Sequence, residues 1–275
     1  MSGILYVTGT PIGNLSDLSP RAAKTLEDVD FIAAEDTRVT LKLLNHLGIK
    51  KPMVSYFEHN KRERGEMICA RIEQGENCAI VTDAGMPCIS DPGEDLIRLC
   101  AERGIKTVVI PGPSAVIAAL AVSGLSTGRF TFEGFLSVNK KSRAEHLDSL
   151  KNERRTMIFY EAPHKLPATL NDFYSVFGDR KLTIARELTK LHEEVIRTTT
   201  ARAAEELSDG SVRGEIVLVL EGCSQEPEGE SYTLSDAVAL AKELQRGGMK
   251  ATDAAKSAAA QTGFKKNEIY KELII

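Results

Sequence analysis

The sequence predicts an α/β protein with two sheets, a doubly wound, mostly parallel sheet in the N-terminal half and a mixed sheet in the second half, followed by a small helical region. Two observations predict this fold class. Over the first 112 residues, short apolar runs rich in Val, Ile, Phe and Tyr alternate with helical segments, as in a sheet buried on both faces. Further along, two apolar runs follow each other too closely to be joined by the helix that a parallel pair requires.

In the N-terminal half, the apolar runs predict strands at residues 4–8, 29–34, 53–57, 78–82 and 107–110. Two of the intervening helices have clear start signals. Ser19 precedes Pro20, which is a cap followed by a proline at the first helical position. Asp91, Pro92 and Glu94 predict a second start of this kind, with Asp91 as the cap and Glu94 in a capping box.

The second half has a different pattern. Its apolar runs predict strands at 129–135, 156–160, 182–186, 194–200 and 215–220, with helices at about 142–152 and 165–177. The third and fourth of these strands are expected to be antiparallel neighbours. Residues 124–128 mark the expected boundary between a domain of residues 1–123 and a domain of residues 124–222. A polar linker, 223–231, then leads to short helices in residues 231–275.

Composition narrows the classes of function. The net charge of −4 argues against bulk electrostatic binding of nucleic acid, although residues 231–275 carry seven Lys or Arg against five Asp or Glu. The longest apolar run, residues 115–122, is far too short for a membrane span. The five cysteines form no C-x-x-C pair and have no His cluster beside them, which predicts reduced thiols in a cytoplasmic protein and no metal site.

Three Gly/Pro-rich loops follow predicted strands, at residues 7–14, 83–93 and 111–115. In an open α/β sheet, ligands bind outside the carboxyl ends of the strands. Glycine lets the backbone approach a ligand closely, and proline restricts the loop. We therefore expect a small-molecule pocket lined by main chain. The first loop lacks the G-x-G-x-x-G pattern because Pro11 takes its middle position, and no P-loop pattern occurs, so NAD and ATP chemistry are disfavoured.

Charged residues also gather at strand ends. One run ends the second strand and holds Asp36, which is either a plain helix cap or a functional group. Two further runs, 159–165 and 185–190, end strands of the second half. We expect the charges of both halves to face each other across one cleft. No Ser/His/Asp or metal-ligand spacing stands out.

Seven ordered motifs resemble one known family. They are T-P-I-G-N, A-A-E-D-T-R, D-A-G-x-P-x-I-S-D-P-G, P-G-P-S-A, F-Y-E-A-P-H-K, A-R-E-L-T-K-x-H-E and G-E-I-V-L-V-L-E-G. Over nearly the whole chain they resemble the tetrapyrrole-methylase family of S-adenosylmethionine-dependent methyltransferases, and its ribosomal RNA branch in particular. Members of that branch methylate the 2′-hydroxyl of a cytidine in 16S ribosomal RNA.

The resemblance implies two α/β domains with the S-adenosylmethionine cleft between them, usually in a homodimer, and 16S rRNA in the small ribosomal subunit as the partner. Tetrapyrrole-type relatives typically carry G-D-P in the long loop, whereas here Met86 precedes Pro87, so an aspartate contact is missing. The family's cofactor contacts map onto strand-end residues of this chain, namely Pro11, Ala84, Gly85, Met86, Ile89, Ser114, Ala115, Glu161 and Leu188.

Methyl transfer to a ribose hydroxyl needs in-line geometry and is helped by a base, since the hydroxyl is a poor nucleophile. Asp36 is the first candidate base and Glu187 the second. Arg186 and Lys190 are further candidate catalytic residues, which would hold phosphates or lower the pKa of the hydroxyl. The candidate contacts with substrate RNA are Arg38, Lys265 and Lys266.

Two other functions remain open at this point. One is a tetrapyrrole methyltransferase of the same fold, against which the motif set and the charged region after residue 231 both weigh. The other is a non-catalytic RNA-binding assembly factor, which would have little need for three loops of the ligand-binding type. Finding cofactor in the purified protein would separate the assembly factor from both enzymes.

Overall fold

The structure is a computed structural model that describes residues 2–224 and 233–274. The chain divides into two compact units, Met1–Cys223 and Ser224–Ile275, and each is described by itself. Most of the predicted linker, residues 225–231, lies outside the described residues. No helix in the described ranges is both long enough and apolar enough to cross a membrane.

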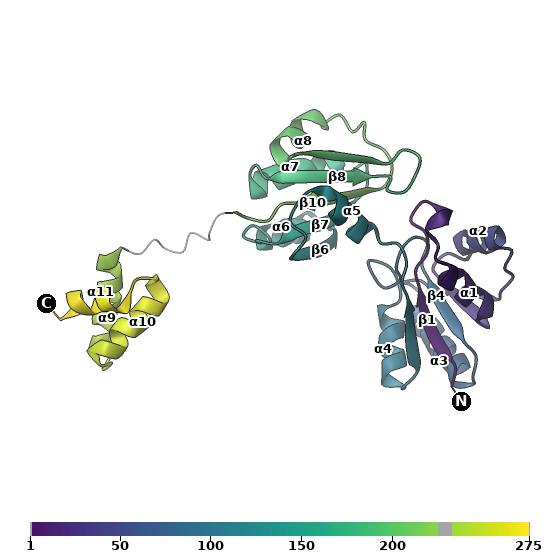
Figure 1. Ribbon diagram of the computed structural model, residues 1–275, viewed down its shortest axis with the longest axis horizontal. Helices are drawn as coiled ribbons and strands as arrows, with labels where there is room; N and C mark the ends of the chain where they lie inside the picture. Colours follow the sequence, from purple (N-terminus) through teal and green to yellow (C-terminus); the bar gives the residue numbers. More distant parts are fainter. Residues whose placement is uncertain (1, 225–232, 275) are drawn as a thin grey trace. The chain divides into compact units, whose positions relative to one another are not determined.

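The first sheet of the larger unit has five parallel strands in the order β3-β2-β4-β1-β5 (Figure 1). The strands are β1 (Ile4–Thr8), β2 (Phe31–Ala34), β3 (Met53–Ser55), β4 (Cys78–Val81) and β5 (Lys106–Ile110). The helices are η1 (Leu15–Asp17, a 3-10 turn), α1 (Pro20–Asp28), α2 (Thr37–Leu47), α3 (Lys61–Glu73) and α4 (Glu94–Glu102). The strands predicted from the sequence are all confirmed to within two residues at each end.

Helices cover both faces of this sheet because its central strands are apolar on both sides. Every residue of β2 and β4 is buried. On one face, α1 and α2 bury Leu26 and Leu44 against the sheet, and on the other, α3 and α4 bury Ile68 and Leu96. Cys69, Cys78 and Cys100 are buried in the second of these cores as free thiols. The predicted doubly wound parallel sheet is confirmed.

The second sheet has the order β6-β7-β10-β8-β9, in which only β6 and β7 pair in parallel. Its strands are β6 (Phe130–Phe135), β7 (Thr156–Glu161), β8 (Lys181–Arg186), β9 (Glu194–Thr199) and β10 (Ile216–Leu220). On one face, α6 (Lys140–Ser149), α7 (Leu166–Phe177) and α8 (Thr200–Glu206) supply a core that includes Leu170 and Phe173. The predicted mixed sheet is confirmed, as is the antiparallel pairing of β8 with β9.

Helix α5 (Ala115–Ser123) covers the other face of the second sheet (Figure 1). Val116 and Leu120 pack in one apolar cluster with Val217 and Val219 of β10. The expected boundary at residues 124–128 places this helix in the first domain, residues 1–123. The apolar side chains of α5 pack against β8 and β10 of the second sheet.

The start of α4 differs from the prediction. Asp91 does not cap the helix, which begins at Glu94 after Gly93, whose φ of 142° lies in the region that favours glycine. No side chain caps this end. The loop before it contains Cys88 and Ser90 at φ values of 73° and 63°, and its Asp91 lines the pocket described below. The start of α1, by contrast, is confirmed, because Ser19 accepts a hydrogen bond from the amide of Ala22.

The smaller unit contains three helices, α9 (Leu234–Arg246), α10 (Ala251–Thr262) and α11 (Lys266–Leu273), in its described residues. Small side chains let the helices approach closely, with Ala237, Ala241 and Ala258 fully buried beside Ile269. A capping box at Thr233 and Asp236 starts α9. The predicted short helices of this region are therefore confirmed.

Candidate active site

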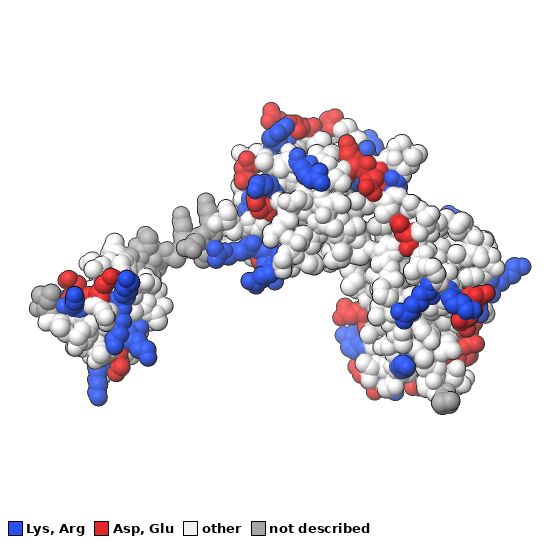
Figure 2. All heavy atoms as spheres, in the orientation of Figure 1, with Lys and Arg blue, Asp and Glu red and all other residues white. Residues whose placement is uncertain are grey.

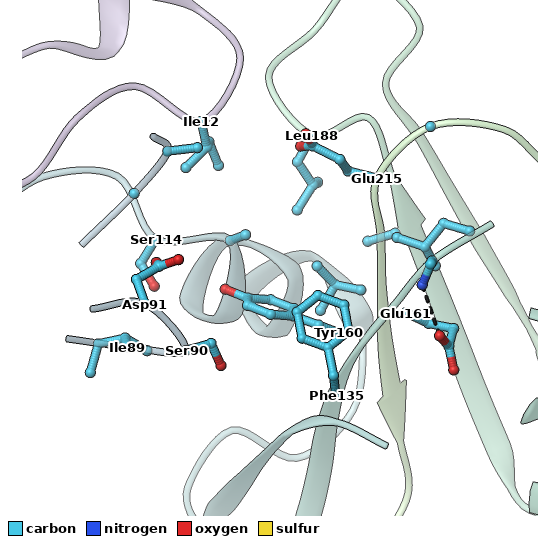
Figure 3. A pocket seen from close by; sticks show the side chains of 18 of the residues that line it. Ile12, Ile89, Ser90, Asp91, Ser114, Phe135, Tyr160, Glu161, Leu188 and Glu215 are labelled. Atoms are coloured by element: carbon cyan, nitrogen blue, oxygen red, sulfur yellow. Dashed lines mark hydrogen bonds between the residues drawn. The ribbon is translucent and has the colours of Figure 1, made fainter. Parts of the chain in front are cut away.

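A pocket of about 400 Å³ lies at the strand ends of the larger unit. Both sheets contribute to it, with loops after β1, β4 and β5 on one side and residues from β6, β7, β8 and β10 on the other (Figure 3). Its volume is in the range of small-molecule sites. The residues that line it are Ile12, Ala84, Gly85, Met86, Ile89, Ser90, Asp91, Ser114, Ala115, Phe135, Tyr160, Glu161, Ala162, Pro163, Ala185, Leu188, Gly214, Glu215, Ile216 and Val217.

The loops of the first sheet are tied to one another beside the pocket. The amides of Thr10 and Gly85 each donate to the carbonyl oxygen of the other, at 2.9 and 3.2 Å. The hydroxyl of Thr10 also donates to the carbonyl oxygen of Thr82 at 3.1 Å. A Cβ placed on Gly9 would lie 2.7 Å from the Cα of Gly112. Glycine at these two positions therefore lets two loops touch, whereas the sequence analysis assigns it to the approach of a ligand.

One wall of the pocket forms where a loop of the first sheet meets a loop of the second. Ile12 and Leu188 share one apolar cluster with Val116 and Val217. At the same place a Cβ on Gly13 would lie 3.1 Å from the carbonyl oxygen of Leu188. The absence of a Cβ at Gly13 thus permits close packing of the two loops, which brings both sheets to one cavity.

The pocket is apolar with acidic groups and without a cation. Among the described residues that line it, none is Lys or Arg. Glu161 is buried, and its carboxylate accepts hydrogen bonds from the amide of Ala162 at 2.8 Å and from the hydroxyl of Thr169. Glu215 lies at the rim with its side chain 74% exposed, and it pairs with Lys190 at 3.1 Å. Such a lining favours a ligand with a positive charge and apolar surface.

Asp91 occupies an unusual position in this lining. Burial, together with the nearby charges of Glu35 and Asp83, raises the pKa of Asp91 to about 6, and the contact with the hydroxyl of Thr82 acts in the opposite direction. Across the pocket, burial and the charge of Asp91 raise the pKa of Tyr160 to about 12. Figure 3 shows the hydroxyl of Tyr160 directed toward the side of the pocket that holds Asp91 and Ser114.

A model of the tetrapyrrole (corrin/porphyrin) methylases matches residues 4–204, which include the first sheet, all strands of the second sheet except β10, and most of the residues that line the pocket. The chain belongs to this family. It is 45% identical to the ribosomal RNA small subunit methyltransferase I of Synechocystis sp., over 98% of this chain and 96% of the relative. It is 48% identical to the protein of the same name from Thermotoga maritima, over 80% of this chain and 99% of that relative.

Solved structures of the family share the fold. The methyltransferase CobJ has a TM-score of 0.61 at 17% identity, with 82% of this chain and 96% of CobJ covered. Uroporphyrin-III C-methyltransferase from Thermus thermophilus, complexed with S-adenyl homocysteine, has a TM-score of 0.57 at 15% identity, with 80% and 97% covered. The expected two-domain α/β fold of this methyltransferase is thereby confirmed.

The structure brings together almost all the residues that the resemblance implies as cofactor contacts. Of that set, every residue except Pro11 lines the pocket. Pro11 lies beside Ile12, which does line it. Met86, at the position where tetrapyrrole-type relatives carry aspartate, is also part of the lining. Assignment of these residues to a cofactor stays a prediction, now with a cavity of suitable size around it.

Asp36 has the contacts of a helix cap. Its carboxylate accepts a hydrogen bond from the amide of Arg38 at 2.8 Å at the start of α2, and it pairs with the Arg38 guanidinium at 2.6 Å. These contacts lower the pKa of Asp36 to about 2. A carboxylate with so low a pKa is a weak base. Neither Asp36 nor Arg38 is among the residues that line the pocket.

The other predicted catalytic residues lie beside the rim of the pocket, outside its lining. Glu187 accepts hydrogen bonds from the amide of Glu215 and from Lys190, both at 2.9 Å, and these contacts lower its pKa. Arg186 pairs with Glu194 and donates to the carbonyl oxygen of Arg213. The catalytic roles expected for Glu187, Arg186 and Lys190 stay predictions, while the contacts show that they hold the β8–β9 loop against the start of β10.

Sequence analysis missed several residues of the lining, notably Ser90, Asp91, Phe135 and Glu215. For Asp91 a signal was present, since an acid in a Gly/Pro-rich loop after a strand is a candidate ligand or catalytic group. The pattern Asp-Pro-Gly-Glu is also typical of a helix start, so Asp91 is assigned as a helix cap in the sequence analysis. Among the described residues, no group of three His, Cys, Asp or Glu side chains could hold a metal ion.

Proposed function

We propose that this methyltransferase transfers a methyl group from S-adenosylmethionine to the ribose 2′-hydroxyl of a cytidine in 16S ribosomal RNA. The observation that carries the proposal is a match along almost the entire chain to curated proteins named ribosomal RNA small subunit methyltransferase I. The match to tetrapyrrole enzymes is limited to 14–18% identity and supports the shared fold alone.

The residues of the pocket fit S-adenosylmethionine. Its sulfonium is a cation, and three carboxylates with no Lys or Arg among the described lining residues provide a field that favours it. The rings of Phe135 and Tyr160, with centroids 5.4 Å apart, add faces that attract a cation. When bound there, the cofactor supplies a methyl group already activated on sulfur. The residues proposed to hold it are Ala84, Gly85, Met86, Ile89, Ser114, Ala115, Glu161 and Leu188.

The contribution of the protein is mainly positioning. Holding an acceptor oxygen and a methyl group in line can supply about 7–11 kcal/mol of the barrier as avoided entropy loss. The tied loops around Thr10, Gly85 and Gly112 provide a rigid frame for this purpose. A ribose can enter the pocket only if its nucleotide leaves the stack, so we expect the target cytidine to be splayed out. Phe135, 59% exposed at the pocket, is a surface on which a base can stack.

The smaller unit is proposed to bind RNA phosphates. Its lysines and arginines are exposed, and Figure 2 shows several of them on the visible face of this unit. None of them forms an ion pair with a described carboxylate. Lys265 and Lys266 stand at the start of α11, where a positive charge opposes the helix dipole, so they do not stabilise that helix. Binding of an anion would offset this repulsion.

The remaining parts of the proposal concern assembly and location. The substrate is proposed to be the small ribosomal subunit in the cytoplasm, because the net charge of −4 offers little bulk attraction to naked RNA. A homodimer is proposed because the edge strand β5 and helix α5 carry exposed apolar side chains, including Val109 and Ile117, each more than half exposed. Burial of such side chains in a second copy would remove them from water.

A gene deletion tests the main proposal. We expect one 2′-O-methylcytidine of 16S ribosomal RNA to disappear on deletion, as measured by mass mapping, and to return with the wild-type gene. Purified protein should methylate small subunits in vitro and bind S-adenosylmethionine in calorimetry. Methylation of a tetrapyrrole but not of RNA would establish the alternative enzyme, and absence of cofactor binding would support the assembly factor.

A double substitution tests the RNA surface. Replacing Lys265 and Lys266 by Ala should weaken binding to small subunits and raise KM, with the methylation rate at saturation unchanged. Each lost phosphate contact should reduce the slope of log affinity against log salt by about 0.7–0.9. Lys24→Ala, on helix α1 where the lysine pairs with Glu27 and Asp28, is a matched surface control. An unchanged salt slope in the double variant would contradict the role of these lysines.

A further inference from the structure

Among the described residues, four titratable side chains line the pocket, and the contacts or position of three of them set them apart from the role of a base. Tyr160, with its pKa raised to about 12, stays protonated. Glu161 is buried with its two oxygens occupied by the Ala162 amide and the Thr169 hydroxyl. Glu215 is exposed at the rim and paired with Lys190. Asp91 is the remaining group, and among the described residues no cation pairs with it.

The backbone around Asp91 is held in an uncommon conformation. Cys88 and Ser90 both have positive φ, which is unfavourable for residues with a side chain, and Gly93 follows at 142°. Pro87 and Pro92 further restrict the loop. In this arrangement Asp91 does not form the helix cap that the sequence pattern would allow. The strain at Cys88 and Ser90 and the missing cap both disfavour this conformation, so a loop with only a structural role would not be expected to adopt it.

The position of the Asp91 carboxylate offers a functional reason for this conformation. Its carboxylate lies on the side of the pocket formed by the loops of the first sheet, across from Tyr160 (Figure 3). It is half-buried, so it meets both the cavity and solvent. A group at this place can reach a ligand in the pocket and can also return a proton to water.

We propose that Asp91 is the catalytic base of this enzyme, which accepts the proton of the attacking ribose hydroxyl. The inference rests on the proposed function. As the hydroxyl oxygen forms its bond to the methyl carbon, the carbon–sulfur bond of the methylsulfonium donor breaks, and its electron pair remains on sulfur as a neutral thioether. The hydroxyl proton moves to the carboxylate of Asp91 and then to water. No further reactant is needed for the atoms and charges to balance.

The surroundings of Asp91 suit this task near neutral pH. Negative groups face it from the neighbouring strand ends, Glu35 after β2 and Asp83 after β4, while Tyr160 of β7 faces it as a neutral phenol. Cys88 in its own loop is kept protonated by a pKa raised to about 11. A base is most effective when its pKa lies near the working pH, because it is then ionised and still holds a proton well.

The test compares methylation by wild type and Asp91→Asn on small subunits purified from a strain that lacks the gene. In single turnover with saturating S-adenosylmethionine, we expect Asp91→Asn to be slower by about 10²–10⁴-fold. Its affinity for the cofactor in calorimetry should change by no more than a few-fold. For wild type, kcat/KM should fall on the acid side with a midpoint close to 6, and the variant should lack this acid limb.

Asp83→Asn is the matched control, since it removes a second carboxylate of the same cluster that does not line the pocket. Because the charge of Asp83 raises the pKa of Asp91, this variant should move the acid limb to lower pH and leave the plateau rate unchanged. A purely structural role for Asp91 would not produce this shift. The control also tests the proposal if Asp91→Asn fails to fold, a point that circular dichroism decides.

Three results would overturn the assignment of Asp91. They are a single-turnover rate of Asp91→Asn within a few-fold of wild type, a loss confined to cofactor affinity, and an acid limb that does not move in Asp83→Asn. Failure of the proposed function has a different signature, because the wild-type enzyme itself would then leave the small-subunit RNA unmodified while still binding S-adenosylmethionine.

Discussion

Asp36 and Asp91 are the same residue type at the ends of neighbouring parallel strands, yet their chemical properties are opposite. Asp36 follows β2, caps α2 and pairs with Arg38, and these contacts lower its pKa to about 2. Asp91 lies in the loop after β4, where burial and neighbouring carboxylates raise its pKa to about 6. The difference shows that the position of an acid at a strand end does not determine its reactivity. Its reactivity is determined by the residues that the fold places around it.

We expect the largest combined change in stability and cofactor affinity from a substitution that displaces the loops around Asp91 and leaves the Asp36 cap unchanged. Gly9→Ala places a Cβ 2.7 Å from the backbone of Gly112, so one loop must move. We expect cofactor affinity to fall at least about tenfold and the free energy of unfolding to fall by about 1–3 kcal/mol. Calorimetry and urea unfolding measure the two quantities. Gly128→Ala, which has no heavy atom within 4 Å of its Cβ, is the control and should be neutral.

A smaller effect is expected on Tm, whose dependence on pH should differ between variants of Asp91 and variants of Asp36. The folded-state pKa of Asp91 lies above its ordinary value of 3.8, so its contribution to stability is present below that pH and is lost as pH rises through about 6. Asp91→Asn should therefore raise Tm at pH above 6, by a modest amount because the side chain is only half-buried. At a pH below the ordinary value the two melting curves should coincide.

Asp36 should show the opposite sign. Its folded-state pKa lies below 3.8, so its contribution is present above that pH and is lost as pH falls through about 2. Asp36→Ala removes the cap of α2 and should lower Tm at neutral pH. Melting curves of both variants over a pH series check these signs. The same direction of change in both variants would show that their surroundings differ less than the structure indicates.

The smallest effect is expected for the activity of Asp36→Asn. The sequence analysis makes Asp36 the first candidate base, for which a loss of about 10²–10⁴-fold would follow. The contacts of Asp36 lead us to expect a rate within a few-fold of wild type, because asparagine retains the cap and the residue does not line the pocket. A single-turnover assay decides between these outcomes. A large loss of methylation rate in Asp36→Asn would support Asp36 as the base and contradict the assignment of that role to Asp91.

The sequence by itself determined the elements and much of the pocket. Short apolar runs predicted every strand of both sheets, because burial in a sheet depends on a short local pattern. The Gly/Pro-rich loops and the family resemblance together predicted eight of the residues that line the pocket, among them Ala84, Ser114 and Leu188. These features are encoded by residues close together in the chain, so local patterns can show them.

Only the tertiary structure decided which charged residue belongs to the pocket. The pattern Asp-Pro-Gly-Glu favours a helix cap at Asp91, whereas in the structure Asp91 lines the pocket and does not cap α4. Asp36, the first candidate base, caps α2 and does not line the pocket. Helix α5 likewise follows a strand of the first sheet and packs on the second. The pKa of Asp91 depends on Glu35, far away in sequence, and the charge of Asp91 in turn raises the pKa of Tyr160, farther still. Desolvation and Coulomb interactions act through space, and those neighbours exist only once the chain has folded.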